Sequence, residues 1–199
     1  MKIADIYQNY YVTPNLAQHM KYVAEVVESL HKIWKGPTLD WDVLNELASL
    51  HDIGNIVKFD FDKYPQFLGA EIVNIDYWKS KQQEMIAKYG KDDHQATKKI
   101  LEEIGLEDWK IQVILGKSFV NTINILNSDN WYLKILAYAD MRVLPSGIAS
   151  LNERIEDVKV RMPKYAGKTD FEELVFASRM LEEQVGSKVQ VEGLSIIGR

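Results

Sequence analysis

The chain has 199 residues, 46% of them hydrophobic, a composition typical of a globular protein with one sizeable core and not of a disordered chain. Its 24 basic and 29 acidic residues give a net charge of −5, which argues against a broad nucleic-acid surface but allows a small anionic substrate. No cysteine is present, which excludes disulfides, thiolate metal ligands and a cysteine nucleophile.

The N-terminal sequence contains no apolar signal core, because Lys2 and Asp5 interrupt it at once. No stretch approaches the roughly 18 apolar residues that a membrane span requires. We therefore expect a cytoplasmic protein without a membrane segment.

Apolar residues at helical spacing, bounded by capping residues, glycine and proline, predict an all-α chain of about eight helices. These helices begin near residues 13, 38, 66, 92, 106, 128, 148 and 169. The stretch 58–65 breaks the helical period and is expected to be a loop. The residues from Lys188 to Glu192 alternate in polarity, which fits a short strand or a partner-binding extension. We expect one helical domain over 1–199, with a core over about 13–162 and a last helix and tail over 163–199.

Three of these helices each bring polar groups to their apolar side. His19 lies among Leu16, Val23 and further apolar residues of the first helix. His51 follows Leu44 and Leu47 by seven and four residues and so continues their stripe, with Asp52 beside it.

Asp140 lies seven residues after Leu133 and four after Leu136, so a carboxylate also points inward. Taken singly, each of these groups has an ordinary interpretation, since buried histidines are commonly hydrogen-bonded and buried carboxylates commonly paired. Together, two imidazoles and two carboxylates form a mixed nitrogen and oxygen ligand set for one divalent cation. The sequence thus predicts a metal site made of His19, His51, Asp52 and Asp140, with positions left for water or substrate.

The same residues resemble the HD-domain superfamily of metal-dependent phosphohydrolases. The resemblance covers about 19–162 and is carried by His19, by Leu50-His51-Asp52-Ile53-Gly54 after an apolar helix, by 137–143 around Asp140 and by 151–155. It implies a helical bundle with these four residues as the metal ligands.

The chain departs from the family pattern at two places. Asn55 stands where many members have a lysine directly after His-Asp-Ile-Gly. His94 resembles the first of the extra histidines that two-metal members carry, but the later pair is missing, since that region reads Leu115-Gly116-Lys117-Ser118-Phe119. We expect one ion, which could be Mn, Fe, Co, Ni, Mg or Zn, with a transition metal favoured. For His94 three roles stay open: an extra ligand, a group of the substrate pocket, or an exposed residue at a helix start.

The resemblance implies metal-assisted hydrolysis of a phosphate ester or anhydride, with Asp52 ligating the ion or bonding the attacking water. The charge on the phosphoryl group needs cations, and the candidates are Lys58, Arg142 and Arg154 in that order, although each could instead serve the surface or a helix ion pair. The substrate is expected to be a nucleotide or another small phosphorylated metabolite, and a homo-oligomer is allowed. The alternative is a metal- or nucleotide-binding regulatory module without turnover; a di-iron oxygen enzyme ranks last, because it needs more histidines.

Overall fold

The structure, a computed structural model, describes residues 2–161, 166–167 and 170–190. Helices account for most of these residues, and the named strands form a single two-stranded sheet. The all-α prediction is therefore confirmed. The expectations that fall on Met162, on Thr169 and on the tail beyond residue 190 lie outside the described residues.

The chain groups into two compact units by its internal contacts. The first unit comprises Met1–Met20 and Ser49–Leu115, and the second comprises Lys21–Ala48 and Gly116–Arg199. Helices α2 (Pro14–Ile33) and α3 (Trp41–Leu50) contribute residues to both units. A compact unit need not fold alone, so the single domain expected over 1–199 stays a prediction.

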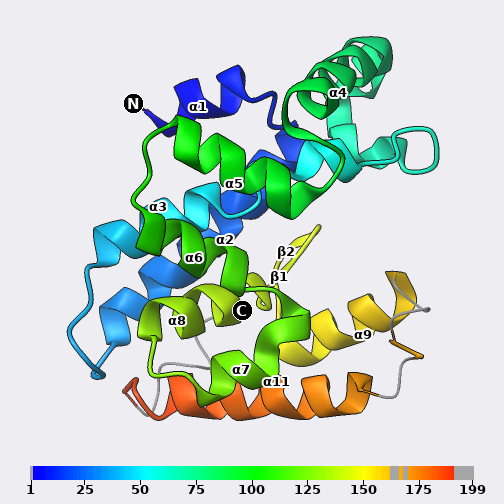
Figure 1. The fold of residues 1–199 in the computed structure, drawn as a ribbon. Coiled ribbons are helices and arrows are strands. Elements are labelled where there is room, and N and C mark those ends of the chain that lie inside the picture. The colour runs from blue at the N-terminus through cyan, green and yellow to red at the C-terminus, as the bar shows by residue number, and fades with distance from the viewer. Residues whose placement is uncertain (1, 162–165, 168–169, 191–199) are drawn as a thin grey trace. The chain divides into compact units, whose positions relative to one another are not determined.

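The first unit is built around α4 (Ile75–Tyr89), which packs on α5 (Asp93–Glu103) and on two 3-10 helices, η1 (Asn55–Lys58) and η2 (Pro65–Asn74) (Figure 1). Its buried side chains include Ile56, Leu68, Met85 and Ile100. In chain order its elements outside α2 and α3 are α1 (Ile3–Asn9), η1 (Asn55–Lys58), η2 (Pro65–Asn74), α4 (Ile75–Tyr89), α5 (Asp93–Glu103) and α6 (Asp108–Gly116), whose last residue belongs to the second unit.

The helix expected from residue 66 to Tyr89 is interrupted in the structure. Residues Pro65–Asn74 form η2, and the regular α-helix begins only at Ile75. Gly69 lies inside η2 with φ of 56°, a left-handed conformation that breaks helical geometry and favours glycine. The prediction was wrong for residues 66–74 because apolar spacing does not distinguish a 3-10 segment with a break from a continuous helix.

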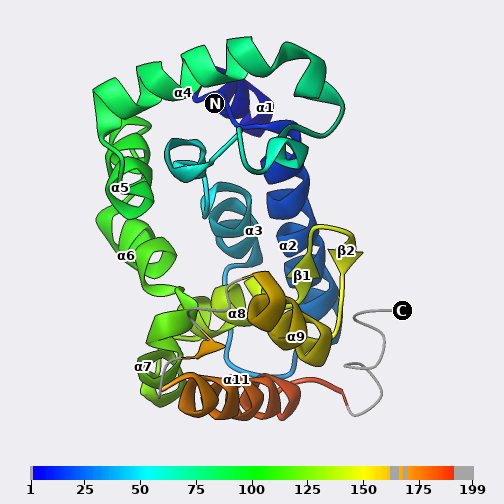
Figure 2. The same ribbon diagram turned by 90° about the vertical axis from the view of Figure 1, so that its right-hand side faces the viewer.

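The second unit centres on α11 (Phe171–Gly186). Helices α7 (Thr122–Asn127) and α8 (Trp131–Asp140) both pack against α11 and lie beside it in both views (Figures 1 and 2). A short turn, η3 (Phe119–Asn121), precedes α7. After α8, β1 (Val143–Leu144) and β2 (Gly147–Ile148) form an antiparallel hairpin. Gly147 has φ of 134° in that hairpin, a value that an L side chain rarely adopts. Helix α9 (Leu151–Arg161) follows, and Leu151, Ile155 and Val158 pack with Phe171 and Val175 of α11.

The last described residues pair with the end of α2. Val189 forms an isolated antiparallel bridge with Trp34, and the Lys35 N–H donates to the Lys188 carbonyl at 2.7 Å. Of the stretch from Lys188 to Glu192, Lys188 lies in a turn and Val189 forms this single bridge, so the described part holds an isolated bridge and not a strand.

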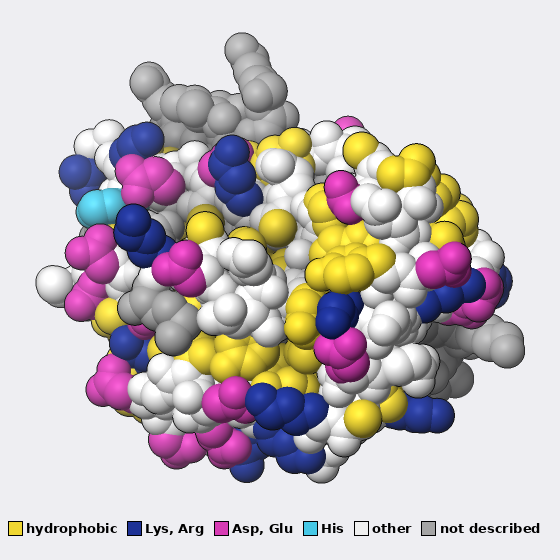
Figure 3. Space-filling view, turned by 90° about the horizontal axis from the view of Figure 1, so that it is seen from above, with side chains coloured by type: hydrophobic (Ala, Val, Ile, Leu, Met, Phe, Trp, Pro, Cys, Tyr) yellow, Lys and Arg dark blue, Asp and Glu magenta, His cyan; other side chains and the backbone are white. Residues whose placement is uncertain are grey.

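None of the described helices combines the length and the apolar character that a membrane crossing needs. On the face shown in Figure 3, Lys and Arg side chains lie interspersed with Asp and Glu around areas of hydrophobic side chains. Ion pairs such as Lys79–Asp62 at 2.5 Å and Lys81–Glu84 at 2.8 Å show the same mixing of charge in the first unit.

Candidate metal centre

His19 and His51 come from two different helical segments of the first unit. His19 is on α2, whose neighbouring apolar residues Leu16 and Met20 are buried. His51 directly follows the last residue of α3, Leu50, at the start of a turn. The His51 side chain is fully buried, whereas the side chains of His19 and Asp52 are each 20% exposed. Both histidines therefore face inward, as the apolar spacing predicted.

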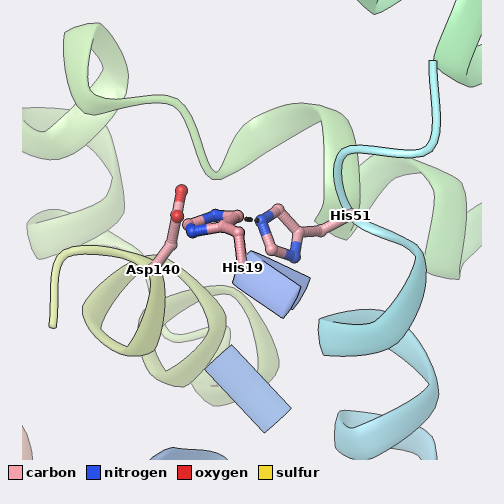
Figure 4. Close-up of side chains that lie close together, drawn as sticks. All are labelled: His19, His51 and Asp140. Atoms are coloured by element: carbon pink, nitrogen blue, oxygen red, sulfur yellow. Dashed lines mark hydrogen bonds between the residues drawn. The ribbon is translucent and has the colours of Figure 1, made fainter. Parts of the chain in front are cut away.

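The two imidazoles face each other through the same kind of atom. The Nε2 atoms of His19 and His51 are 3.3 Å apart (Figure 4). Oδ2 of Asp52 lies 3.6 Å from Nε2 of His51 and 3.8 Å from Nε2 of His19. Three ligand atoms of the first unit therefore converge on one small space.

The spacing of these three atoms fits a metal ion. A point equidistant from all three lies about 2.1 Å from each, which matches Zn–N bonds of about 2.0–2.1 Å and carboxylate bonds of about 2.0–2.2 Å. Two imidazole Nε2 atoms that face each other can both offer lone pairs to a cation, whereas without one they need one donor and one acceptor tautomer. By these distances His19, His51 and Asp52 form a candidate His/Asp metal site.

The turn that carries His51 and Asp52 is fixed by α4 and α5. The Gly54 N–H donates to Oγ1 of Thr97 on α5 at 3.2 Å. A Cβ added at Gly54 would lie 2.4 Å from the Thr97 backbone nitrogen, so glycine is needed for this close approach. Gln82 of α4, which is buried, donates to the carbonyls of Ile56 and Phe59, both at 2.7 Å. These contacts hold the chain just after the two ligands in one conformation.

Asp140 ends α8 in the second unit, where it forms an ion pair with Lys117. Nζ of Lys117 lies 2.8 Å from Oδ2 of Asp140, and the two side chains are only 12% and 19% exposed. The predicted inward carboxylate is therefore compensated by a lysine, as an ion removed from water requires. Sequence reasoning missed Lys117, because an inward Asp140 signals that a cation is near but spacing does not tell which basic residue supplies it.

The three cations expected to bind the phosphoryl group all bond to groups of the protein. Lys58 pairs with Asp93 at 2.6 Å, and Arg154 pairs with Asp157 at 2.9 Å. Their roles toward a substrate stay predictions.

Arg142, only 5% exposed, donates from Nε to the Ala149 carbonyl at 2.7 Å and from its guanidinium to the Tyr138 hydroxyl. Burial raises the pKa of that tyrosine to about 12, so the hydroxyl stays neutral. Arg142 therefore ties the end of α8 to the hairpin. His94 is exposed in the first turn of α5. The substrate-binding roles expected of Arg142 and His94 stay predictions.

No family model, curated protein or solved structure matches the chain.

Proposed function

We propose that the protein is a metal-dependent phosphohydrolase that cleaves a phosphate ester or anhydride of a nucleotide or another small phosphorylated metabolite. The convergence of the His19, His51 and Asp52 ligand atoms on a space of metal-ion size carries this proposal. The resemblance of 50–54 and 137–143 to the HD-domain superfamily supports the phosphate chemistry.

Asp140 is the proposed fourth ligand, and Figure 4 draws it with the two histidines. His19, His51 and Asp140 each offer one ligand atom to such a site. With Asp52, the set contains two neutral imidazoles and two carboxylates, whose charges offset a divalent ion. Four protein ligands leave positions on an octahedral ion for water and substrate oxygens. Imidazole ligands favour Mn, Fe, Co, Ni or Zn over Mg.

An ion bound here would lower the pKa of its water and polarise a phosphoryl oxygen. His19 and His51 hold their Nε2 atoms toward that position, and the buried ring of His51 has little freedom to turn away. Asp52 serves as a ligand and, since a carboxylate has about four lone-pair sites, it also accepts a hydrogen bond from the attacking water.

Phosphate release tests the proposal. Chelator-stripped protein is refilled in turn with Mn, Co, Ni and Mg and assayed on nucleotides and small phosphate esters. Metal-dependent turnover of one substrate class, lost in Asp52→Ala, is the expected result.

Tight metal binding without turnover on any substrate would contradict the hydrolase and favour a regulatory module. The pairing of Lys58, Arg142 and Arg154 with acceptors of the protein is the observation that favours this second candidate. A protein that binds no metal would contradict both.

A further inference from the structure

Asn55 is buried, but the fold makes no use of its carboxamide. The residue is 7% exposed and begins η1, just after the turn that carries His51 and Asp52. Its backbone N–H donates to the Asp52 carbonyl at 2.9 Å, whereas the carboxamide has no hydrogen-bond partner among the residues that the structure describes. A carboxamide offers two N–H donors and a carbonyl oxygen. Because buried polar groups are almost always hydrogen-bonded, this one is suited to a group from outside the chain.

The carboxamide of Asn55 keeps some contact with solvent. In the described part of the chain, the sealed side-chain nitrogen and oxygen atoms without a partner belong to Thr13, Trp78 and Arg154, and none belongs to Asn55. A small ligand can therefore reach the amide. Gln82 shows the contrast, because it is 8% exposed and donates to two backbone carbonyls at 2.7 Å. Its amide serves the fold, whereas that of Asn55 is left for another task.

The backbone holds Asn55 close to Asp52. The hydrogen bond between them closes a four-residue turn, in which Gly54 has φ of −86° and ψ of −3°, the conformation of the third residue of a type I turn. Such a turn brings the Cα atoms of its first and last residues within about 7 Å of each other. The contact of Gly54 with Thr97 fixes this turn, and all four residues belong to the first unit.

We propose that Asn55 is a substrate-binding residue whose carboxamide donates a hydrogen bond to a phosphoryl oxygen of the substrate beside Asp52. The inference rests on the proposed function and deepens it, because it names a neutral donor for the phosphoryl group. Lys58 and Arg154, by comparison, pair with carboxylates of the protein. A hydrogen bond to a charged phosphoryl oxygen is stronger than one between two neutral groups.

The test separates phosphate binding from metal binding and from folding. Full-length wild type, Asn55→Leu and Asn55→Ala are loaded with Mn, their metal content is determined, and inorganic phosphate is titrated by calorimetry. We expect equal Mn content in the three proteins and about tenfold weaker phosphate binding in both variants, since a hydrogen bond to a charged group is lost. The urea midpoint of metal-free Asn55→Leu should equal or exceed that of wild type, because no internal hydrogen bond is removed.

Gln184→Leu is the matched control, because it also replaces a carboxamide with an apolar side chain. Oε1 of Gln184, which is half-buried, accepts from Nζ of Lys134 at 2.7 Å, and Lys134 is only 5% exposed. Neither residue belongs to the proposed site. This variant should have a lower urea midpoint, since a buried ammonium loses an acceptor, and should bind Mn and phosphate like wild type.

Three results would overturn the inference, and circular dichroism would first confirm that the variants are folded. The first is unchanged phosphate affinity in Mn-loaded Asn55→Leu and Asn55→Ala. The second is loss of Mn from both variants, which would show that Asn55 serves the ion and not the substrate. The third is a urea midpoint that falls in Asn55→Leu as far as in Gln184→Leu, which would show that the carboxamide supports the fold. If wild type binds no Mn, the proposed function itself fails, and the inference fails with it.

Discussion

His51 and Asp52 are adjacent in the chain, yet both reach the same space. Neighbours within an α-helix point about 100° apart. Here α3 ends at Leu50, and the turn that follows frees the backbone to aim both side chains at His19. The inward direction of the two histidines was predictable from apolar spacing. One metal site that includes Asp52 was also predicted, but the spacing of the three atoms was not, because it depends on where α3 stops.

The Asp52→Ala variant tests the ligand assignment at this scale. Loss of a direct ligand should weaken metal binding by more than about 100-fold, because even partners that only orient a ligand are worth about 10–100-fold. The measurement is metal content per chain after dialysis, with circular dichroism to show that the helices remain. Full metal occupancy in the folded variant would refute the assignment.

His31→Ala is the control for a general loss of imidazole. His31 is exposed, lies 3.9 Å from Glu28 and stacks on Trp41 with ring centroids 4.8 Å apart. This variant should keep its metal.

Among the elements, the contact between the turn at Gly54 and α5 determines how firmly the ligands are held. Apolar periodicity located α5 and its cap correctly, and Asp92 accepts from the Gln95 N–H at 2.7 Å as the capping prediction requires. It did not reveal α1 or α7. These helices have only seven and six residues and bury few side chains, so they lack a long enough apolar stripe to be recognised.

We expect Gly54→Ala to lower the free energy of unfolding by about 1–3 kcal/mol, since the added Cβ would meet the Thr97 backbone nitrogen at 2.4 Å. Urea denaturation measures the change. Gly116→Ala is the matched control, because its Cβ would meet only the methyl groups of Leu133, at 3.3 and 3.7 Å. Equal unfolding midpoints for the Gly54 and Gly116 variants would show that the close approach at Gly54 carries no such constraint.

Glu103 links the ends of α4 and α5 and gives a pH-dependent prediction. Hydrogen bonds from Lys88, at 2.9 Å, and from Tyr89, at 2.8 Å, lower the pKa of Glu103. The pKa of Glu103 is therefore lower in the folded chain than in the unfolded chain. Its hydrogen bonds stabilise the fold at pH values above the unfolded pKa, and this stabilisation is lost as the pH falls through the folded pKa.

The Glu103→Gln variant should accordingly be less stable than wild type by under about 1 kcal/mol at pH 7, since the side chains of Lys88 and Glu103 are 58% and 44% exposed. The difference should be smaller at about pH 3, because Glu103 loses its charge as the pH falls through its lowered pKa. Denaturant unfolding at both pH values measures it. A difference that persists or grows in acid would mean that the carboxylate charge is not its cause.

For the whole molecule, the all-α class followed from composition and spacing, because helical periodicity repeats over many residues and errors at single boundaries do not change it. The two-unit grouping did not, since α2 and α3 are continuous helices whose residues belong to both units. No linker composition marks such a division. The cytoplasmic location and the homo-oligomer stay predictions.

Metal binding should stabilise the folded chain as a whole. The ligands converge only after distant segments have folded, so an ion that binds the native state alone adds about 2.7 kcal/mol at 100 times its Kd. We expect Mn or Co to raise Tm, a chelator to reverse the rise, and Asp52→Ala to show no metal effect. Identical Tm values with and without each metal would contradict a folded-state site.

Anomalous diffraction from crystals of the Mn- or Co-loaded protein, recorded at the metal edge, tests the central claim most directly. The account predicts one strong peak per chain, within bonding distance of Nε2 of His19, Nε2 of His51 and carboxylate oxygens of Asp52 and Asp140. A peak bound by other residues, or no peak in protein that carries metal in solution, would contradict it.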